Sequence, residues 1–341
     1  MIWTEWDKLT EIIVGDVYDD ISNLDVNDNE FKEGMHRILE ETREDLNKLS
    51  ELIESFNVKV YRPKQLKFRP EQTRVFNSIV PYPAVFPRDM HIVYGNQIIN
   101  TIGGDPNRYN ESDFFVEIMT ELFNQGRDYI SMPKPLLSND YIDYKDHEGK
   151  ILYHAANILK CGDTLLYSTP YTDKFVGRGT HTGFKWIKQH VKNVRWAEVK
   201  RPGHADGRIA LLAPKVLLAK ETNLIPHELR DWDVVKINSK ALPRDFEMFR
   251  QTSFYSSRVK EWLNTWIGNV DETIFDINVL SIDPYNVISN SYDKDIATEL
   301  KKRGINLIPF NFRHKFFFDG GLHCATLDLS REGERETYVT R

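Results

Sequence analysis

A thiol, an imidazole and two carboxylates are the side chains of this sequence whose types suit one common reaction. Cys324 is the candidate nucleophile, and the glycines just before it let the backbone come close to a substrate. His204 is the candidate acid and base, because an imidazole exchanges protons near neutral pH. Asp89 and Asp206 can each accept hydrogen bonds from a planar guanidinium, and that cation would also favour the thiolate. These types predict attack of Cys324 on a guanidinium carbon.

Each of these residues also has a structural interpretation. A lone cysteine is often a small buried apolar residue, and Cys161, at a hairpin turn, is interpreted in that way. The pair His204 and Asp206 can be a structural hydrogen bond. His323 competes with His204 as the base, but side chains of neighbours in an extended chain point apart, so we expect His323 to face away from Cys324. The hypothesis of a guanidine site therefore depends on the whole set.

A unit of short hairpin, amphipathic helix and single strand recurs along the chain. The first hairpin is predicted at His91–Tyr94 and Gln97–Asn100 around a Gly-Asn turn, and a helix that ends at Gly126 leads to a strand at Asp128–Ser131. Apolar runs and turn residues predict three more units of this kind. Their two hairpin strands and closing strand are expected at 158–161, 164–167 and 194–199; at 209–212, 216–218 and 234–237; and at 279–282, 286–289 and 305–310.

A fifth unit appears when the two ends of the chain are joined. Strands at 326–329 and 10–14, a helix at about 31–56 and a strand at 58–61 complete it. Five units closed in a ring predict an α/β fold, a five-bladed pseudo-symmetric α/β propeller of ββαβ units, with residues 1–341 as one domain. An open parallel α/β sheet is the alternative, but it would place one strand per helix. The polar residues 330–341 are expected to be a frayed tail.

Polar residues stand just before the first strand of every unit. Because equivalent positions of a closed ring meet at one end of its central axis, this spacing predicts a single site. The residues at these positions are Asp89, His154, Asn157, His204, Asp206, Asp276, His323 and Cys324.

Composition excludes several classes of partner. The formal net charge of −6 and the absence of Lys/Arg clusters argue against nucleic acid and anionic membranes. No apolar run approaches the roughly eighteen residues of a membrane span. Two cysteines cannot make a disulfide framework, which favours a reducing, cytoplasmic location. The acidic loop 19–30 resembles part of a calcium loop, but Glu30 and His36 occupy the positions of its glycine and last ligand, so a solvated loop is expected.

The motifs resemble those of glycine amidinotransferase and the inosamine-phosphate amidinotransferases, in the guanidine-modifying pentein superfamily. The matching segments run nearly end to end: 5–7 (EWD), 12–15 (IIVG), 86–90 (FPRDM), 95–99 (GNQII), 132–135 (MPKP), 203–206 (GHAD) and 320–328 (GGLHCATLD). The resemblance implies a five-bladed α/β propeller in which Cys324 becomes amidinated, His204 shuttles protons, and Asp89 and Asp206 hold the guanidinium. It also implies an arginine-like guanidine donor, a primary amine acceptor, a homodimer, and no metal or organic cofactor.

The sequence departs from this family at His154 and Asn157, where the family has an acidic stretch. His154 replaces the carboxylate that would orient the catalytic imidazole, so we keep His154 as a catalytic candidate, and Asn157 and His323 as substrate-binding candidates. An arginine for the donor carboxylate has no match, and Asn223 stands near its expected position. Three hypotheses remain: an amidinotransferase, a guanidine hydrolase in which water resolves the amidino-cysteine, and a binding protein that keeps the pocket.

Overall fold

Five three-stranded sheets of one pattern frame the described part of the chain. A computed structural model describes residues 1–20, 29–64, 66–67, 83–104, 108–136, 147, 149–168, 178–200, 203–238, 275–290 and 292–340. In each sheet an antiparallel hairpin is followed by a third strand, which lies parallel to one strand of the hairpin. This repetition confirms the predicted ββαβ propeller and excludes the open parallel sheet.

Four of the sheets are continuous in sequence. The first has β5 (His91–Tyr94), β6 (Gln97–Asn100) and β7 (Asp128–Ser131); the second has β8 (Ile158–Cys161), β9 (Thr164–Ser168) and β10 (Arg195–Val199). The third has β11 (Ile209–Ala213), β12 (Val216–Ala219) and β13 (Asp233–Lys236); the fourth has β14 (Leu280–Asp283), β15 (Asn286–Ser289) and β16 (Asn306–Pro309). Gly95 and Gly162 stand in the first two hairpin turns with φ of 60° and 68°, a backbone region that favours glycine.

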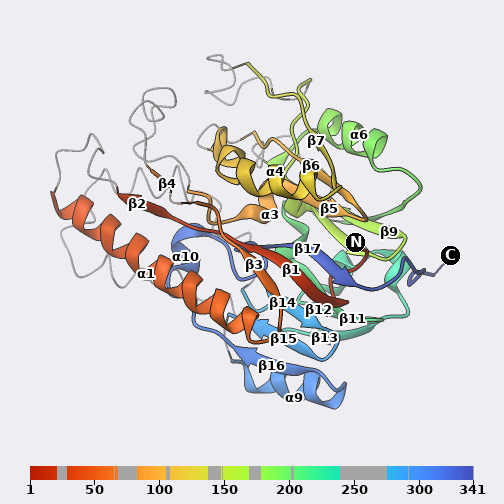
Figure 1. The fold of residues 1–341 in the computed structure, drawn as a ribbon. Coiled ribbons are helices and arrows are strands. Elements are labelled where there is room, and N and C mark those ends of the chain that lie inside the picture. Colours follow the sequence, from red (N-terminus) through yellow and green to blue (C-terminus); the bar gives the residue numbers. More distant parts are fainter. Residues whose placement is uncertain are drawn as a thin grey trace.

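The fifth sheet joins the two ends of the chain. β17 (Thr326–Glu332) pairs antiparallel with β1 (Lys8–Val14), and β1 pairs in parallel with β3 (Lys59–Tyr61). Figure 1 shows these red and blue segments side by side. The pairing lets residues near the N-terminus reach the same region as Cys324, which stands directly before β17.

Helices lie on the outside of the strands (Figure 1). They are α1 (Asn29–Glu54), η2 (Glu111–Phe115) with α4 (Val116–Asn124), α6 (His181–His190), η6 (Thr222–Leu224), η7 (His227–Leu229) and α9 (Lys294–Lys302). Asp293 is the N-cap of α9, and its carboxylate accepts from the backbone N–H groups of Asp295 and Ile296. α1 buries Met35, Leu46 and Leu49 completely, and each such side chain contributes about 1.5–3 kcal/mol.

Apolar clusters between neighbouring units close the ring. One cluster joins the first and second units, another the second and third, and another the third and fourth; the largest joins the fourth, fifth and first. Members of these clusters, in the same order, are Ile99 with Leu165, Leu159 with Leu211, Leu218 with Val287, and Ile288 with Ile12 and Val93. Each unit is therefore held mainly by the burial of its faces against two neighbours.

The prediction of a frayed C-terminal tail is wrong for its described part, 330–340. β17 continues to Glu332, and Thr337 forms a β-bridge to the turn between β8 and β9. The ring of Tyr338 lies 5.0 Å from that of Trp6, edge to face, and Val339 is buried in the cluster between the second and third units. The tail is polar in composition, but its few apolar side chains are enough to fix it.

Two further strands form a small sheet apart from the five repeats. β2 (Tyr18–Asp20) pairs with β4 (Leu66–Lys67), a small sheet that the sequence pattern did not indicate.

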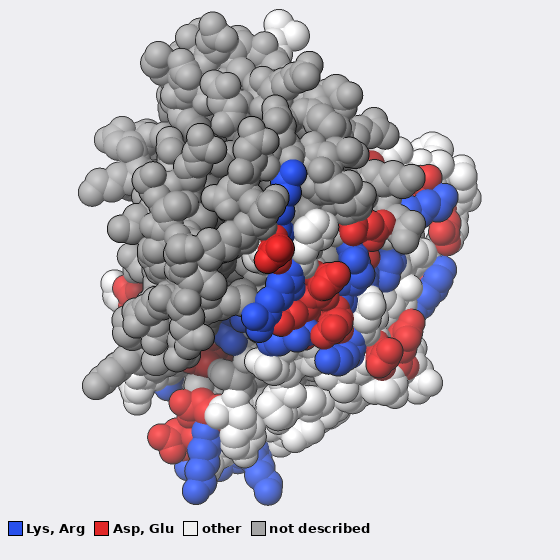
Figure 2. Space-filling view, turned by 90° about the vertical axis from the view of Figure 1, so that its left-hand side faces the viewer, with Lys and Arg blue, Asp and Glu red and all other residues white. Residues whose placement is uncertain are grey.

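Figure 2 shows one face of the molecule, on which the described acidic and basic side chains alternate. Pairs such as Arg37 with Glu41 on α1 follow this alternation. Among the described residues, no helix is both long and apolar enough to cross a bilayer.

Short helical turns position the predicted site residues. A turn stands immediately before the first strand of each of the first three units: α3 (Pro87–Met90), η3 (Ala155–Asn157) and η5 (Ala205–Gly207). Turns at 275–277 and 322–325 stand before β14 and β17, the latter after α10 (Lys315–Phe318). All five turns lie at the same end of their sheets, which is the arrangement that the polar spacing predicts.

Candidate active site

Three site residues occupy equivalent positions in three units. Asp89, Asn278 and Cys324 each stand two residues before the first strand of a unit, which begins at His91, Leu280 and Thr326, respectively. All three of these site side chains are buried. The pseudo-symmetry of the ring therefore directs a carboxylate, an amide and a thiol to one place.

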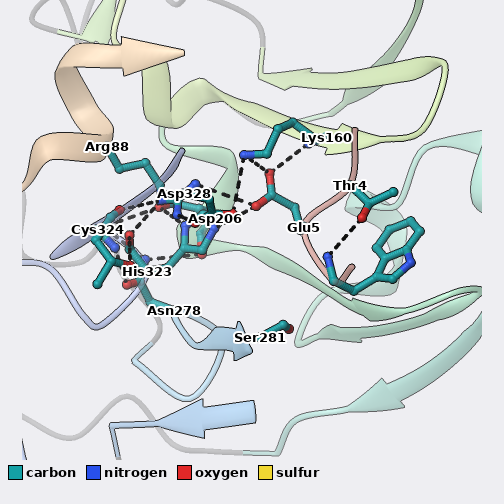
Figure 3. Close-up of polar contacts among 12 residues, drawn as sticks. Thr4, Glu5, Arg88, Lys160, Asp206, Asn278, Ser281, His323, Cys324 and Asp328 are labelled. Atoms are coloured by element: carbon teal, nitrogen blue, oxygen red, sulfur yellow. Dashed lines mark hydrogen bonds and ion pairs between the residues drawn. The ribbon is translucent and has the colours of Figure 1, made fainter. Parts of the chain in front are cut away.

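The thiol of Cys324 lies between an amide and a carboxylate (Figure 3). Asn278 Nδ2 donates to Cys324 Sγ at 3.1 Å, and Sγ donates to Asp206 Oδ2 at 3.4 Å. The backbone N–H of Cys324 donates to Asn278 Oδ1 at 3.1 Å, so one amide group holds both ends of the residue. Asn290 supports this arrangement by donating to the carbonyl of Asn278 at 2.7 Å.

The side chain of His323 does not point away from that of Cys324, contrary to the expectation from the sequence. His323 Nδ1 lies 2.8 Å from Asp206 Oδ2, the same oxygen that the Cys324 thiol contacts. The reason is the local backbone: residues 322–325 form a turn, closed by the bond from Ala325 N–H to Gly321 O at 3.0 Å, and are not extended. Consecutive side chains of a turn need not lie on opposite sides.

Burial and negative charge hold the Cys324 thiol in its protonated form. Desolvation is the largest cause that raises the pKa of Cys324 well above its usual value, and the carboxylates of Asp206 and Asp89 raise it further. The hydrogen bond from Asn278 acts in the opposite direction. A nearby cation would thus be needed to make the thiolate at neutral pH.

Arg108 holds one carboxylate oxygen of Asp89. Arg108 Nη1 donates to Asp89 Oδ2 at 2.5 Å, and Glu111 holds the other edge of the Arg108 guanidinium through two bonds of 2.5 and 2.9 Å. Burial would raise the pKa of Asp89, but the charges of His204, Arg108 and Arg178 outweigh it and keep that pKa below its usual value. Asp89 is therefore an ionised carboxylate in a buried position.

Two buried carboxylate oxygens are left for another group. Asp89 Oδ1 and Asp206 Oδ1 accept no hydrogen bond within the described residues. Buried acceptors are almost always paired in folded proteins. Two such oxygens beside one thiol indicate a place for a ligand that carries several N–H donors.

The candidate base, His204, lies against His154 and Asp89. His204 Nε2 is 2.9 Å from His154 Nδ1, and His204 Nδ1 is 3.8 Å from Asp89 Oδ1. Burial lowers the pKa of His154 well below its usual value, and Arg108, His204 and Arg178 lower it further. His154 is therefore a neutral imidazole at the position where the family resemblance places an acid.

Asn157 supports the backbone beside this pair. Its Nδ2 donates to the carbonyl of Arg178 at 2.8 Å, and the backbone N–H of His154 donates to the same oxygen at 3.2 Å. Arg178 stands shortly before α6. Asn223 is exposed in η6.

A buried network of charges lies behind His323. Glu5 Oε2 is 3.2 Å from His323 Nε2, and Glu5 Oε1 pairs with Lys160 Nζ at 2.8 Å. Arg88 donates to the carbonyl of His323 at 2.7 Å and pairs with Asp328. Burial would raise the pKa of Glu5, but Lys160, His323 and Arg88 lower it well below its usual value. Figure 3 shows this network joining the N-terminal segment to the turn of Cys324.

Asp89, His154 and His204 also have the donor set of a metal site. One ligand atom from each lies within 4.8 Å of the others. However, the guanidinium of Arg108 is bonded to Asp89, and that of Arg178 lies 3.5 Å from His154 Nδ1. These two fixed positive charges oppose a divalent cation, so the cluster suits proton transfer better than metal binding.

The sequence reasoning missed several residues of this site. The fourth unit contributes Asn278, not Asp276, because its first strand begins at Leu280 and the equivalent position is two residues earlier. That spacing, already visible for Asp89 and Cys324, was the available signal. Partners such as Arg108 and Glu5 come from loops and the N-terminal segment, for which the repeat gives no signal.

Comparisons with known proteins agree with this fold. No family model matches the chain. It is 27% identical to inosamine-phosphate amidinotransferase 1 of Streptomyces glaucescens, over 99% of this chain and 98% of that protein. It is 25% identical to the L-arginine:L-lysine amidinotransferase of Pseudomonas savastanoi pv. phaseolicola, over 99% and 96%.

A solved structure shows the same fold. The inosamine-phosphate amidinotransferase of Streptomyces griseus superposes with a TM-score of 0.70 at 24% identity, covering 99% of this chain and 98% of that one. The similarity thus extends over the whole chain in sequence and in architecture. By this full-length similarity and this fold, the chain is an enzyme related to the amidinotransferases, with the pentein architecture.

Proposed function

We propose that the chain moves an amidino group from an arginine-like guanidine to a primary amine through a covalent amidino-cysteine at Cys324. The observation that carries the proposal is the contact of the Cys324 thiol with Asp206, near a second buried carboxylate, Asp89. A guanidinium has five N–H donors in one plane. The oxygens of Asp89 and Asp206 that accept no hydrogen bond within the described residues are suitable acceptors for them.

The donor itself would activate the nucleophile. At neutral pH the raised pKa of Cys324 keeps it as a thiol, because it is buried near two negative charges. A guanidinium held by Asp89 and Asp206 offsets those charges and favours the thiolate. The reactive sulfur would therefore form mainly when the donor is bound.

The reaction has two halves, with His204 as the proton carrier. In the first, the S–C bond forms while the thiol proton passes to His204, and that proton then moves to the leaving amine as its C–N bond breaks. In the second, the acceptor amine forms a new C–N bond and gives its proton to His204. The proton returns to the sulfur of Cys324 as the C–S bond breaks, so atoms and charges balance.

The test is a screen of guanidine donors against amine acceptors, with product analysis. Arginine and simpler guanidines are the donors; glycine, lysine and amino sugars are the acceptors. We expect a new guanidine product that requires both substrates. A ureido product that forms regardless of the amine would show a hydrolase instead. Binding of donors without turnover or adduct would show a binding protein, the hypothesis that His154 and Asn157 motivate.

Assembly and location belong to the same proposal. We propose that residues 1–341 act as one domain, supported by the pairing of β1 with β17, and that the chain forms a homodimer, as the family resemblance implies. The two cysteines, Cys161 and Cys324, are free and buried, which suits the reducing cytoplasm. Light scattering of the purified protein tests the dimer: a monomer mass at micromolar concentration would contradict it.

A further inference from the structure

Three residues, His154, Asn157 and Arg178, contact one another at the position where the family resemblance places an acid. Arg178 is anchored through its carbonyl, which accepts from Asn157 Nδ2 at 2.8 Å and from the backbone N–H of His154 at 3.2 Å. Its guanidinium then returns to His154, with Nη1 at 3.5 Å from Nδ1. The two departures from the family pattern, at positions 154 and 157, are therefore linked through a single arginine.

This contact bears on which nitrogen of His154 carries a proton. A guanidinium has only donors, so the His154 Nδ1 at 3.5 Å from Arg178 Nη1 suits the role of acceptor. His154 is completely buried, and burial together with the charges of Arg108, His204 and Arg178 keeps its pKa well below the usual value. In a neutral imidazole that accepts at Nδ1, the proton is on Nε2.

The fold also leaves space for the imidazole of His154 beside Gly103. A Cβ atom on Gly103 would lie 1.8 Å from His154 Nε2 and 2.2 Å from its Cδ2. Any larger residue at position 103 would therefore displace the imidazole. The loop after β6 is shaped around a histidine at position 154, and this is independent of the contact with Arg178.

The tautomer of His154 in turn determines that of His204. Because His154 Nδ1 accepts, His204 Nε2 at 2.9 Å must donate to it. The lone pair of neutral His204 is then on Nδ1, which lies 3.8 Å from Asp89 Oδ1. A proton taken up in the reaction would reside on Nδ1 and face that carboxylate. The charged groups around the pair are Asp89, Arg108 and Arg178.

We propose that His154 is a positioning residue that fixes the tautomer of His204 without a negative charge, and that Asp89 is the counter-charge of the His204 imidazolium. Asp89 would then serve both the donor cation and the proton carrier. The inference rests on the proposed function for the role of His204. The arrangement of protons, however, is a property of the resting protein and can be measured without turnover.

The direct test is ¹⁵N NMR of histidine-labelled protein near neutral pH, with signals assigned from His154→Asn and His204→Gln variants. We expect His154 as a neutral imidazole protonated on Nε2, and His204 with a proton on Nε2. A His204 imidazole protonated on Nδ1 alone, or a charged His154, would overturn the inference even if amidino transfer is active. In Arg178→Met, which keeps an unbranched side chain but has no donor, we expect His154 to lose its single tautomer.

Kinetics supply a second readout. His154→Asn offers a carbonyl oxygen that Arg178 can orient, so kcat should fall by about tenfold or less, whereas His154→Ala should lose about 100-fold. His154→Asp adds a negative charge beside the imidazolium and should move the acidic limb of the kcat/KM profile to higher pH. Unchanged kcat in the alanine variant, or an unmoved limb in the aspartate variant, would overturn the proposal.

Discussion

The side chains of His323 and Cys324, consecutive in the chain, meet at a single atom, Oδ2 of Asp206. His323 Nδ1 lies 2.8 Å from it and Cys324 Sγ 3.4 Å. This oxygen is thus occupied, and only Oδ1 of Asp206 accepts no hydrogen bond within the described residues. The turn at 322–325 therefore both presents the thiol and orients the carboxylate that would hold the donor.

Asn278 is expected to matter for catalysis more than for folding. In Asn278→Ala the donor to Cys324 Sγ is lost, and kcat should fall by about 100- to 1,000-fold, as when one preorganised donor is removed. The pKa of the thiol should rise further, since this hydrogen bond lowers it. Steady-state kinetics and thiolate absorbance measure these effects. Asn306→Ala, at the exposed first residue of β16, is the control. A kcat of Asn278→Ala within twofold of wild type would contradict the assigned contact.

Removal of the Asp206 charge should make the thiol more acidic. Burial, the largest cause of the raised pKa of Cys324, remains in Asp206→Asn, but the main carboxylate contribution is lost. The thiolate should therefore appear at lower pH than in the wild type, although still above the usual value for cysteine. Ultraviolet titration without substrate checks this, with Cys324→Ala as the blank. An unchanged midpoint would show that Asp206 is not ionised beside the thiol.

Glu5 should stabilise the fold in a pH-dependent way. Glu5→Gln removes the nearest carboxylate of the buried Lys160, 2.8 Å away, whereas Arg88 keeps its pair with Asp328, so the free energy of unfolding at pH 7 should fall by about 3–5 kcal/mol. The pKa of Glu5 is lowered in the folded state, so its contribution is complete above the unfolded pKa of about 4.3 and is lost as the pH falls below it. The free energies of unfolding of the wild type and of Glu5→Gln should therefore converge as the pH is lowered.

Urea unfolding at several pH values tests this prediction. Glu332→Gln is a matched control, because Glu332 pairs with Lys8 at the surface with both side chains more than half exposed. Its effect should be about 0–1 kcal/mol. Equal losses for the two variants would mean that the buried network contributes no more than a surface pair.

Gly321 should be needed for the geometry of the thiol. A Cβ at this position would lie 2.6 Å from Asn290 Nδ2 and 2.7 Å from Asn278 Oδ1, the oxygen that holds the Cys324 backbone. Gly321→Ala should therefore lower kcat by about 100-fold through displacement of Asn278. Gly149→Ala, which would meet no atom within 4 Å, should leave kcat unchanged. Similar activities of the two variants would contradict this.

The repeating unit made much of the fold predictable. Two-residue turns such as Gly95-Asn96 and alternating apolar runs set the hairpins, and three-to-four spacing set α1. The closure of the ring through β1 and β17 could be predicted because each end of the chain carries only part of a repeating unit. The tail was mispredicted because Tyr338 and Val339 gain their stability from distant residues such as Trp6, which local composition does not reveal.

The site was predictable only where the repeat places it. Asp89, Asp206 and Cys324 were found from their types and positions. Asn278 was missed because Asp276, two residues earlier, was chosen as the polar residue before β14. The orientation of His323 depends on a turn that the sequence does not distinguish from an extended segment. The contacts of Arg108 lie between segments that only the folded ring brings together.

Peptide mass mapping after a brief reaction with arginine, in the absence of an acceptor amine, shows whether Cys324 carries the amidino group. We predict a gain of about 42 Da, the mass of an amidino group, on the peptide that contains Cys324. The adduct should persist in Cys161→Ala, disappear in Cys324→Ala, and be removed by an acceptor amine. An adduct on another residue, or turnover that survives in Cys324→Ala, would contradict the account.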